Sequence, residues 1–289
     1  MTTVAHQPTQ EKTTFNWRKI LLPISVALVV VFFLAPILWQ VLTSFKVNAD
    51  ISAIPTVYIP RRLTLDHYRS LFIRRPFTAY MLNSAFVSVT STVLALGLGA
   101  PAAYVLARMR LPGHRIMLAS ILIVTLFPAV LLFLGLLEVV KFFDLGNNYL
   151  ALIIPYTAIN LPLTILVMRS FFQQLPKDLE DSAKVDGYNT VQMLTQIVLP
   201  MTLPALATTG ILAFIATWNE FLFALTFITR ESMKTIPVAT AQLSGASVFE
   251  IPYGPIAAAT ILGTLPLLIL VLVFQRKIVQ GLTAGAVKG

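Results

Sequence analysis

Six long apolar stretches constrain this chain more than any other feature of its sequence. They cover residues 20–42, 81–107, 116–138, 150–172, 201–227 and 255–275. A helix needs about 20 apolar residues to cross the hydrocarbon core of a bilayer, and each stretch has that length. Helices satisfy their own backbone hydrogen bonds inside a membrane, where water is absent. The sequence therefore predicts an all-α polytopic membrane protein with six transmembrane helices.

The composition excludes several other classes of protein. Of the 289 residues, 57% are hydrophobic and 11% are charged, whereas soluble domains carry about 25% charged residues. The chain has no cysteine, so it has neither disulfides nor thiolate metal sites, and its three histidines lack metal-ligand spacing. We expect no metal and no bound cofactor. The net charge of +9 is attributed to Lys and Arg at helix ends facing lipid headgroups, not to nucleic-acid binding.

The predicted organisation is a tail, a membrane domain and a second tail. Residues 1–19 are mostly polar and lack a signal-peptide layout, so we expect an N-terminal tail followed by a retained first helix. Residues 20–275 form the six-helix domain, and residues 276–289 form a C-terminal tail. Six spans place both termini on one side. A modest excess of Lys and Arg, clearest in the short loop 108–115, favours a cytoplasmic location for both.

The loop between the fourth and fifth stretches, residues 173–200, is unusually polar and patterned. Four of the twelve acidic residues of the chain fall within nine positions there: Asp178, Glu180, Asp181 and Asp186. Pro176 followed by acidic residues predicts a helix start. Gly187 predicts a turn or a close approach by another backbone. With a second helical run over 189–198, the product is a helix–turn–helix that serves either as a knob for a partner's groove or as a structural elbow.

This segment resembles the EAA loop of the inner-membrane permeases of bacterial ABC importers. That family's pattern is Glu-Ala-Ala, three residues, Gly, nine residues and Ile-x-Leu-Pro. The matching positions, with complete spacing, are Asp181, Ser182, Ala183, Gly187, Ile197, Leu199 and Pro200. Asp181 and Ser182 depart from the family residues, so Glu180 and Asp181 are both candidates for the main partner contact. Asp186, next to the glycine, completes the predicted ATPase-coupling set.

The resemblance extends over nearly the whole chain. Asn83-Ser84 followed by 103–108 is similar to the second span of sugar-importer permeases, and 152–156 is similar to the fourth. Trp-Asn-Glu-Phe at 218–221 is similar to the family's Trp-Asn-Glu/Asp. The C-terminal segment 275–289 resembles the tail of the maltose/trehalose branch. These matches favour carbohydrate import over the other substrates that such importers carry.

The resemblance implies a fold, a set of partners and a function. The fold is the type I ABC importer permease fold in a bacterial inner membrane. The partners are a second, homologous permease, two copies of a cytoplasmic ATPase that receive the EAA loops, and a periplasmic or lipid-anchored binding protein. ATP and Mg would bind the ATPase, and this chain itself has no Gly-x4-Gly-Lys-Ser/Thr loop, so it is not expected to be an enzyme. The cargo would be a di- or oligosaccharide or small glycoside, such as trehalose, maltose or glucosylglycerol.

Polar residues within the fifth stretch are candidates for the substrate path. Ionisable groups inside a membrane are costly and usually functional, and Glu220 lies about midway along this stretch. The predicted path residues are Phe214, Trp218, Asn219, Glu220 and Phe221. On a helix, the three aromatic residues share one face and the two polar residues point elsewhere. Glu220 and Asn219 would then contact substrate, pin the helix to a neighbour, or take part in gating.

Other polar residues and other functions offer alternatives to this interpretation. Asn83 and Asn160 are expected to form hydrogen bonds across helices and not to bind substrate. An ABC permease for glycerol 3-phosphate or another small solute is an alternative. A self-sufficient secondary transporter would need coupling acids in several spans, and only Glu220 qualifies. A membrane enzyme or scaffold has no supporting catalytic constellation.

Overall fold

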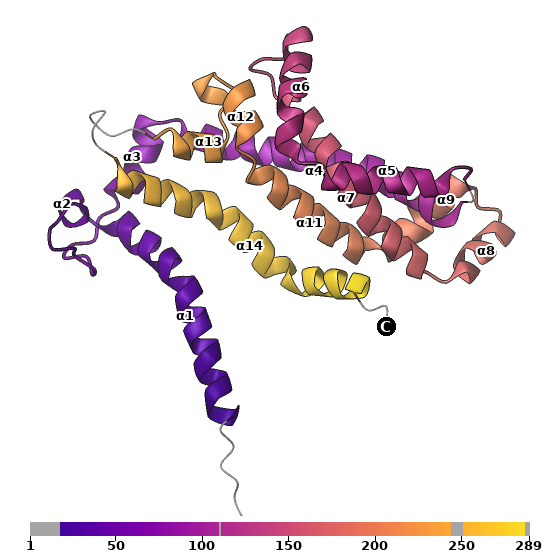
Figure 1. The fold of residues 1–289 in the computed structure, drawn as a ribbon, viewed down its shortest axis with the longest axis horizontal. Coiled ribbons are helices and arrows are strands. Elements are labelled where there is room, and N and C mark those ends of the chain that lie inside the picture. Colours follow the sequence, from indigo (N-terminus) through magenta and orange to yellow (C-terminus); the bar gives the residue numbers. More distant parts are fainter. Residues whose placement is uncertain (1–17, 110, 244–250, 287–289) are drawn as a thin grey trace, which may run out of the picture.

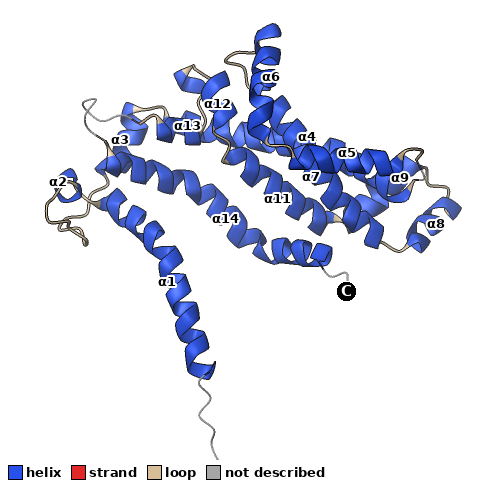
Figure 2. Cartoon of the chain, viewed as in Figure 1, coloured by secondary structure: helices blue, strands red, loops and turns tan. Residues whose placement is uncertain are grey.

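The computed structural model describes residues 18–109, 111–243 and 251–286. Within these ranges the chain is helical and has no strand beyond one isolated bridge between Lys46 and Leu63 (Figure 2). The prediction of an all-α protein is confirmed. Most of the predicted N-terminal tail, residues 1–17, lies outside the described residues, as do residues 287–289.

Four helices are each long and apolar enough to cross a membrane. They are α1 (Arg18–Phe45), α4 (Phe77–Arg108), α7 (Leu150–Gln174) and α14 (Tyr253–Ala286). Shorter helices complete the described parts: α2 (Asn48–Ile51), α3 (Asp66–Arg74), α5 (His114–Leu126), α6 (Ala129–Phe142), α8 (Lys177–Val185), α9 (Thr190–Met193), α10 (Leu199–Met201), α11 (Leu203–Trp218), α12 (Leu222–Phe227) and α13 (Ile236–Ala241), with a π-helical turn at Leu194–Val198 and a 3₁₀ turn at Glu231–Met233.

Two further spans are bent pairs of helices, which brings the possible number of crossings to the predicted six. The third predicted span, 116–138, is not one straight helix, because α5 and α6 meet at 95°. Pro128 explains the break: the residue before a proline avoids helical backbone, and Phe127 has a ψ angle of 128°. The second pair runs from Thr190–Met201 into α11 with a bend of 80°.

A second predicted span differs from the structure. The fifth span was expected to run over 201–227, but the helix ends at Trp218 and resumes only at Leu222. Local apolar content could not reveal this break, because hydropathy does not distinguish a continuous helix from a helix with a three-residue break. The sixth predicted span, 255–275, agrees with the apolar span Tyr253–Gln275, and its helix α14 continues to Ala286.

The core of the molecule is the contact between α4 and α7, which pack along much of their length. Small residues allow the close approach: a Cβ added at Gly99 would lie 2.6 Å from Cγ2 of Thr164. Ser91 on α4 donates a hydrogen bond to the Ile153 carbonyl oxygen, 3.4 Å away. α11 packs against α4, α7 and α14. Small residues at helix contacts are the usual solution in membranes, where helix association depends on close packing.

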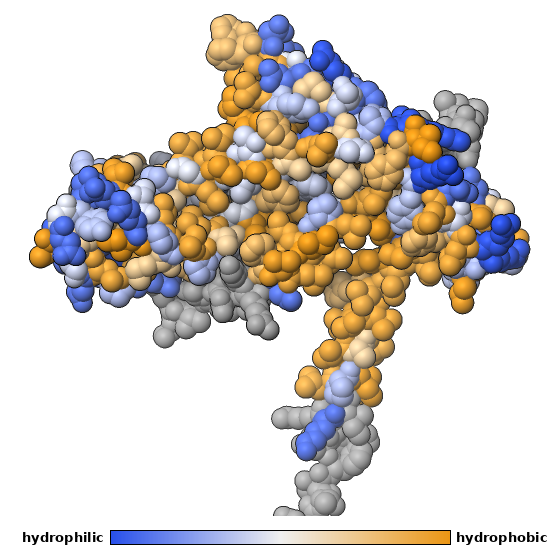
Figure 3. Space-filling view, turned by 180° about the vertical axis from the view of Figure 1, so that it is seen from behind, coloured by the Kyte–Doolittle hydropathy of each residue, from blue (hydrophilic) through white to orange (hydrophobic). Residues whose placement is uncertain are grey.

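By contrast, α1 diverges from the other helices and contacts them mainly through its C-terminal part, against α14 (Figure 1). Every described side chain from Leu21 to Gln40 is exposed. Figure 3 shows apolar residues over the middle of the molecule and along α1. Hydrophilic residues gather towards the ends of the molecule. Such an apolar surface is expected of a chain that is surrounded by lipid or by another membrane subunit.

Loops at the end opposite α8 are held by hydrogen bonds from the spans. The Asn83 amide donates to the carbonyl oxygens of Ser232 and Lys234, both at 2.9 Å, and accepts from the Tyr149 hydroxyl at 2.7 Å. The Tyr80 hydroxyl donates to the Glu231 carboxylate. The prediction that Asn83 bonds between elements is therefore confirmed.

Candidate functional site

The predicted helix–turn–helix is present at one end of the molecule, between α7 and α11 (Figure 1). α8 begins directly after Pro176, and its acidic first turn and basic last turn suit the helix dipole. Gly187 has a φ of +84° and lies just after α8, where two backbone hydrogen bonds close the end of the helix. One runs from the Gly187 N–H to the Lys184 carbonyl (3.1 Å), the other from the Tyr188 N–H to the Ala183 carbonyl (2.9 Å). This left-handed ending is the Schellman arrangement that glycine favours.

The second helix of the segment starts with a reciprocal cap. The Asn189 side chain accepts from the Gln192 N–H at 2.9 Å, and the Gln192 side chain accepts from the Asn189 N–H at 3.0 Å. The chain then continues through the π-helical turn into α10. Ile197 and Leu199 are partly buried and pack against the cluster that contains Tyr104 and Phe172. These two predicted coupling residues therefore seat the segment on the membrane helices, and they do not face outward.

Glu180 and Asp181, the two candidate carboxylates, have opposite environments. Glu180 is buried, and its Oε1 lies 2.7 Å from Nε of Arg108 at the end of α4. Asp181 is exposed and pairs with Lys184 one helical turn away, at 3.0 Å. Ala183 is also buried. Four other predicted coupling residues are exposed and lie outside the core: Ser182, Asp186, Gly187 and Pro200.

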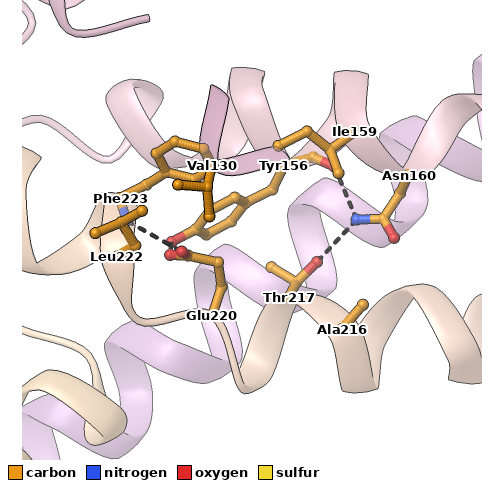
Figure 4. Close-up of a pocket in the computed structure, with 9 residues that line it drawn as sticks. All are labelled: Val130, Tyr156, Ile159, Asn160, Ala216, Thr217, Glu220, Leu222 and Phe223. Atoms are coloured by element: carbon orange, nitrogen blue, oxygen red, sulfur yellow. Dashed lines mark hydrogen bonds between the residues drawn. The ribbon is translucent and has the colours of Figure 1, made fainter. Parts of the chain in front are cut away.

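The break between α11 and α12 brings Glu220 into contact with two other helices. Its carboxylate accepts hydrogen bonds from the backbone N–H groups of Phe223 (3.0 Å) and Ala224 (3.2 Å), at the start of α12. The Tyr156 hydroxyl of α7 donates a third hydrogen bond to it (Figure 4). A carboxylate at this position satisfies N–H groups that have no partner inside α12. Glu220 therefore caps α12 and joins it to α7.

A pocket of about 140 Å³ lies beside Glu220. Its walls come from four helices, and its polar groups are Glu220, Tyr156, Asn160 and Thr217 (Figure 4). The Asn160 amide donates to the Thr217 hydroxyl of α11 at 3.2 Å, as predicted for a bond between helices. The pocket is otherwise apolar, with Val130, Ile159 and Leu222 among its lining residues.

None of the other predicted path residues lines this pocket. Trp218 is buried, donates its indole N–H to the Gly263 carbonyl of α14 at 3.1 Å, and packs on Phe214 at 5.4 Å between ring centres. Asn219 and Phe221 lie in the break itself and are exposed. The expected shared face of Phe214, Trp218 and Phe221 is wrong, because the helix that would create it ends at Trp218.

Two residues of this region were missed as site residues by sequence reasoning. Tyr156 and Arg108 appeared only inside longer matching segments, yet each is the interhelical partner of a predicted carboxylate. Arg108 ends an apolar stretch, where a basic residue is ordinarily assigned to lipid headgroups. No pattern in the sequence pairs Tyr156 with a residue 64 positions away.

Comparison with known proteins places the chain in a family. Residues 95–284 match the family described as binding-protein-dependent transport system inner membrane component. The trehalose transport system permease protein SugB of Mycobacterium tuberculosis is 40% identical over 91% of this chain and 95% of its own length. The sulfoquinovosyl glycerol transport system permease protein SmoH of Agrobacterium fabrum is 37% identical over the full length of both chains.

The fold agrees with a solved structure. A chain from the crystal structure of a bacterial ABC transporter involved in the import of the acidic polysaccharide alginate aligns with a TM-score of 0.75. The alignment covers 93% of this chain and 99% of that one at 23% identity, so the likeness concerns the fold. With its apolar helices and full-length permease relatives, this multi-pass chain belongs to the family of binding-protein-dependent transport system inner membrane components, the permease subunits of ABC importers.

Proposed function

We propose that this chain is one permease subunit of an ATP-driven importer that carries a di- or oligosaccharide or a small glycoside into the cytoplasm. The observation that carries the proposal is the outward-facing α8 segment, with Asp181 and Gly187 exposed on a chain that aligns end to end with sugar-transport permeases. Relatives named for trehalose, for trehalose/maltose and for sulfoquinovosyl glycerol support this substrate class. Binding of ATP and Mg belongs to the partner ATPase in this proposal.

The exposed part of the segment is the proposed contact with the ATPase. Asp181 and Asp186 offer charge, and Val185, with 88% of its surface exposed, offers an apolar tip between them. An exposed valine surrounded by charged residues is more stable when covered by a groove than in water. A helix–turn–helix with charged sides and an apolar tip is the shape that such a groove accepts.

The exposed residues of the α11–α12 break are the proposed substrate contacts. Asn219 and Phe221 combine an amide with an aromatic ring, which suits the hydroxyl groups and C–H faces of a sugar. Non-helical backbone at membrane depth is tolerated where it is buried in protein or lines a water-filled cavity. Broken helices are also where many transporters bind their cargo. Glu220 would hold the break in shape, and Phe214 and Trp218 at the end of α11 would support it, with Trp218 tied to α14 through Gly263.

A second permease is the proposed partner along the membrane. Among the described residues, Leu21 to Gln40 of α1 are all exposed, as are Asn219 and Phe221 at the break, so a translocation path would need a second wall. A periplasmic or lipid-anchored binding protein would deliver the cargo to the end opposite α8. Closure of the ATPases would then switch the path between outward-open and inward-open states.

The test is reconstitution of this chain with its partner permease, ATPase and binding protein in proteoliposomes. Radiolabelled trehalose, maltose, glucosylglycerol and glycerol 3-phosphate are supplied separately, with and without ATP inside the vesicles. The proposal expects ATP-dependent uptake of one of the three sugars, and stimulation of ATP hydrolysis by the same compound. Uptake of glycerol 3-phosphate alone would overturn the substrate class. Uptake driven by a proton or sodium gradient without ATP would overturn the importer mechanism in favour of a secondary transporter.

A further inference from the structure

Arg108 joins three helices at the α8 end of the molecule. It is the last residue of α4, and its Nε lies 2.7 Å from the Glu180 carboxylate of α8. Its Nη2 donates a hydrogen bond of 2.6 Å to the carbonyl of Leu175, the residue directly after α7. The side chains of Arg108 and Glu180 are only 8% and 11% exposed. One guanidinium therefore fixes the ends of α4 and α7 to the middle of α8.

α8 has few other attachments. Of its nine residues, only Glu180 and Ala183 are buried. Ala183 contributes a small apolar contact in the cluster with Tyr104 and Met193. A buried ion pair resists separation, since removing either partner leaves an unpaired charge without water. The Arg108–Glu180 pair therefore restrains how α8 can move relative to α4 and α7.

The same two helices lead to the α11–α12 break. Arg169 of α7 donates from Nε to the Leu106 carbonyl of α4 at 3.3 Å, a second tie close to Arg108. Further along α7, Tyr156 donates to Glu220 and Asn160 donates to Thr217, at the break itself. Polar contacts near one end of α7 thus tie it to α4, and polar contacts further along the same helix tie it to the residues around the pocket.

We propose that Glu180 is a positioning residue that transmits movement of α8 to the α4–α7 pair, whereas Asp181 faces the partner ATPase. The proposal rests on the proposed function, in which α8 docks to that ATPase. In this arrangement α8, α4 and α7 move as one body, and α7 carries the movement to Glu220. The two neighbouring carboxylates therefore have different roles in coupling: Glu180 acts inside the subunit, and Asp181 acts at its surface towards the ATPase.

The first experiment compares Glu180→Gln with its matched neighbour Asp181→Asn in the complete reconstituted complex. Two quantities are measured: how much ATPase co-purifies with the permeases, and how many trehalose or maltose molecules enter per ATP hydrolysed. Glu180→Gln is expected to retain the ATPase within twofold but to lower uptake per ATP about tenfold, within the range of typical coupling between sites. Asp181→Asn is expected to reduce ATPase retention. The charge reversal Glu180→Arg with Arg108→Glu is expected to restore at least part of the lost coupling.

Three results of this experiment would overturn the proposal. Loss of ATPase retention in Glu180→Gln as large as in Asp181→Asn would place Glu180 in the partner interface. An unchanged ratio of uptake to hydrolysis would remove Glu180 from coupling. A charge reversal that restores nothing, in a complex that still assembles, would show that the pairing itself is not required.

A second measurement covers the case in which Glu180→Gln fails to fold. The chain has no native cysteine, so Leu98→Cys on α4 and Lys177→Cys at the start of α8 can carry spin labels. Both positions are exposed, and neither belongs to the proposed ATPase contact. With partner cysteines removed, their separation is measured without nucleotide and with ATP bound. The proposal expects the same distance between the labels in both states, and a change in this distance would overturn it. Failure of the proposed docking would instead appear as full ATPase retention in Asp181→Asn, whatever the labels report.

Discussion

The Tyr156 hydroxyl and the Glu220 carboxylate, which come from different spans, share a hydrogen bond beside a break in the fifth span. Glu220 also accepts from two backbone N–H groups of α12. An intramembrane carboxylate thus has a complete set of hydrogen-bond partners inside its own subunit. Glu220 lies next to exposed Asn219 and Phe221, so it would shape the proposed substrate path without itself touching the substrate.

Replacing Glu220 with Gln should destabilise the subunit. The amide has one acceptor oxygen in place of two, so at least one N–H or hydroxyl donor loses its partner, at a cost of about 1–3 kcal/mol. Thermal unfolding of the purified complex measures this loss. Glu138→Gln is the matched control, because Glu138 is exposed and pairs only with Lys141. Normal stability combined with lost or altered sugar uptake would contradict the capping role and make Glu220 a substrate contact.

Replacing Gly187 with Val should weaken ATPase retention. No atom lies within 4 Å of a Cβ built at this position, so the effect would come from the φ of +84° and not from a clash. β-Branched residues are strained in this region, whereas Asn tolerates it. Gly187→Asn should therefore keep the turn and most of the retained ATPase. Equal retention in Gly187→Val and in the original chain would show that the turn is not part of the docking surface. Gly187→Asp adds a charge at the same place, and intact assembly and uptake in that variant would lead to the same conclusion.

Two glycines on α4 offer a matched test of the α4–α7 contact. A methyl group at Gly99 would clash with Thr164, but nothing lies within 4 Å of one at Gly97. Gly97→Ala should be neutral or stabilising by up to about 1 kcal/mol, because alanine favours helix. Gly99→Ala should destabilise by about 1–3 kcal/mol, as overpacking does. Unfolding temperatures of the two purified variants decide the question, and equal values would mean that α4 and α7 do not pack this closely.

Acid should loosen the loop at the end opposite α8. Hydrogen bonds from Lys234 and Tyr80 hold the pKa of Glu231 below its ordinary value of 4.5. Because the folded pKa is depressed, the carboxylate stabilises the fold above 4.5, and this contribution is lost as pH falls through the lower, folded value. Glu231 is half exposed, so the effect is at most about 1 kcal/mol. Glu231→Gln should flatten the pH dependence of unfolding below pH 5. An unchanged acid profile would show that these bonds do not hold the charged form.

Several features of the protein follow from local sequence alone. The six crossings were predictable because a bilayer demands long apolar runs whatever the tertiary arrangement. The start of α8 after Pro176 and the turn at Gly187 were predictable because backbone geometry near proline and glycine is set within a few residues. Asn83 and Asn160 were expected to bond between elements because an unpaired amide in a membrane is costly.

Only the tertiary structure decided how neighbouring polar residues differ. Glu180 and Asp181 are adjacent and chemically alike, and one is buried while the other is exposed, because α8 presents Glu180 to Arg108, 72 positions earlier. The break after Trp218 is likewise not evident from the sequence. Its stability depends on the Glu220 carboxylate and on Tyr156, which comes from another span. Apolar length and backbone preference are local properties. The partner of a buried charge is set by the packing of distant helices.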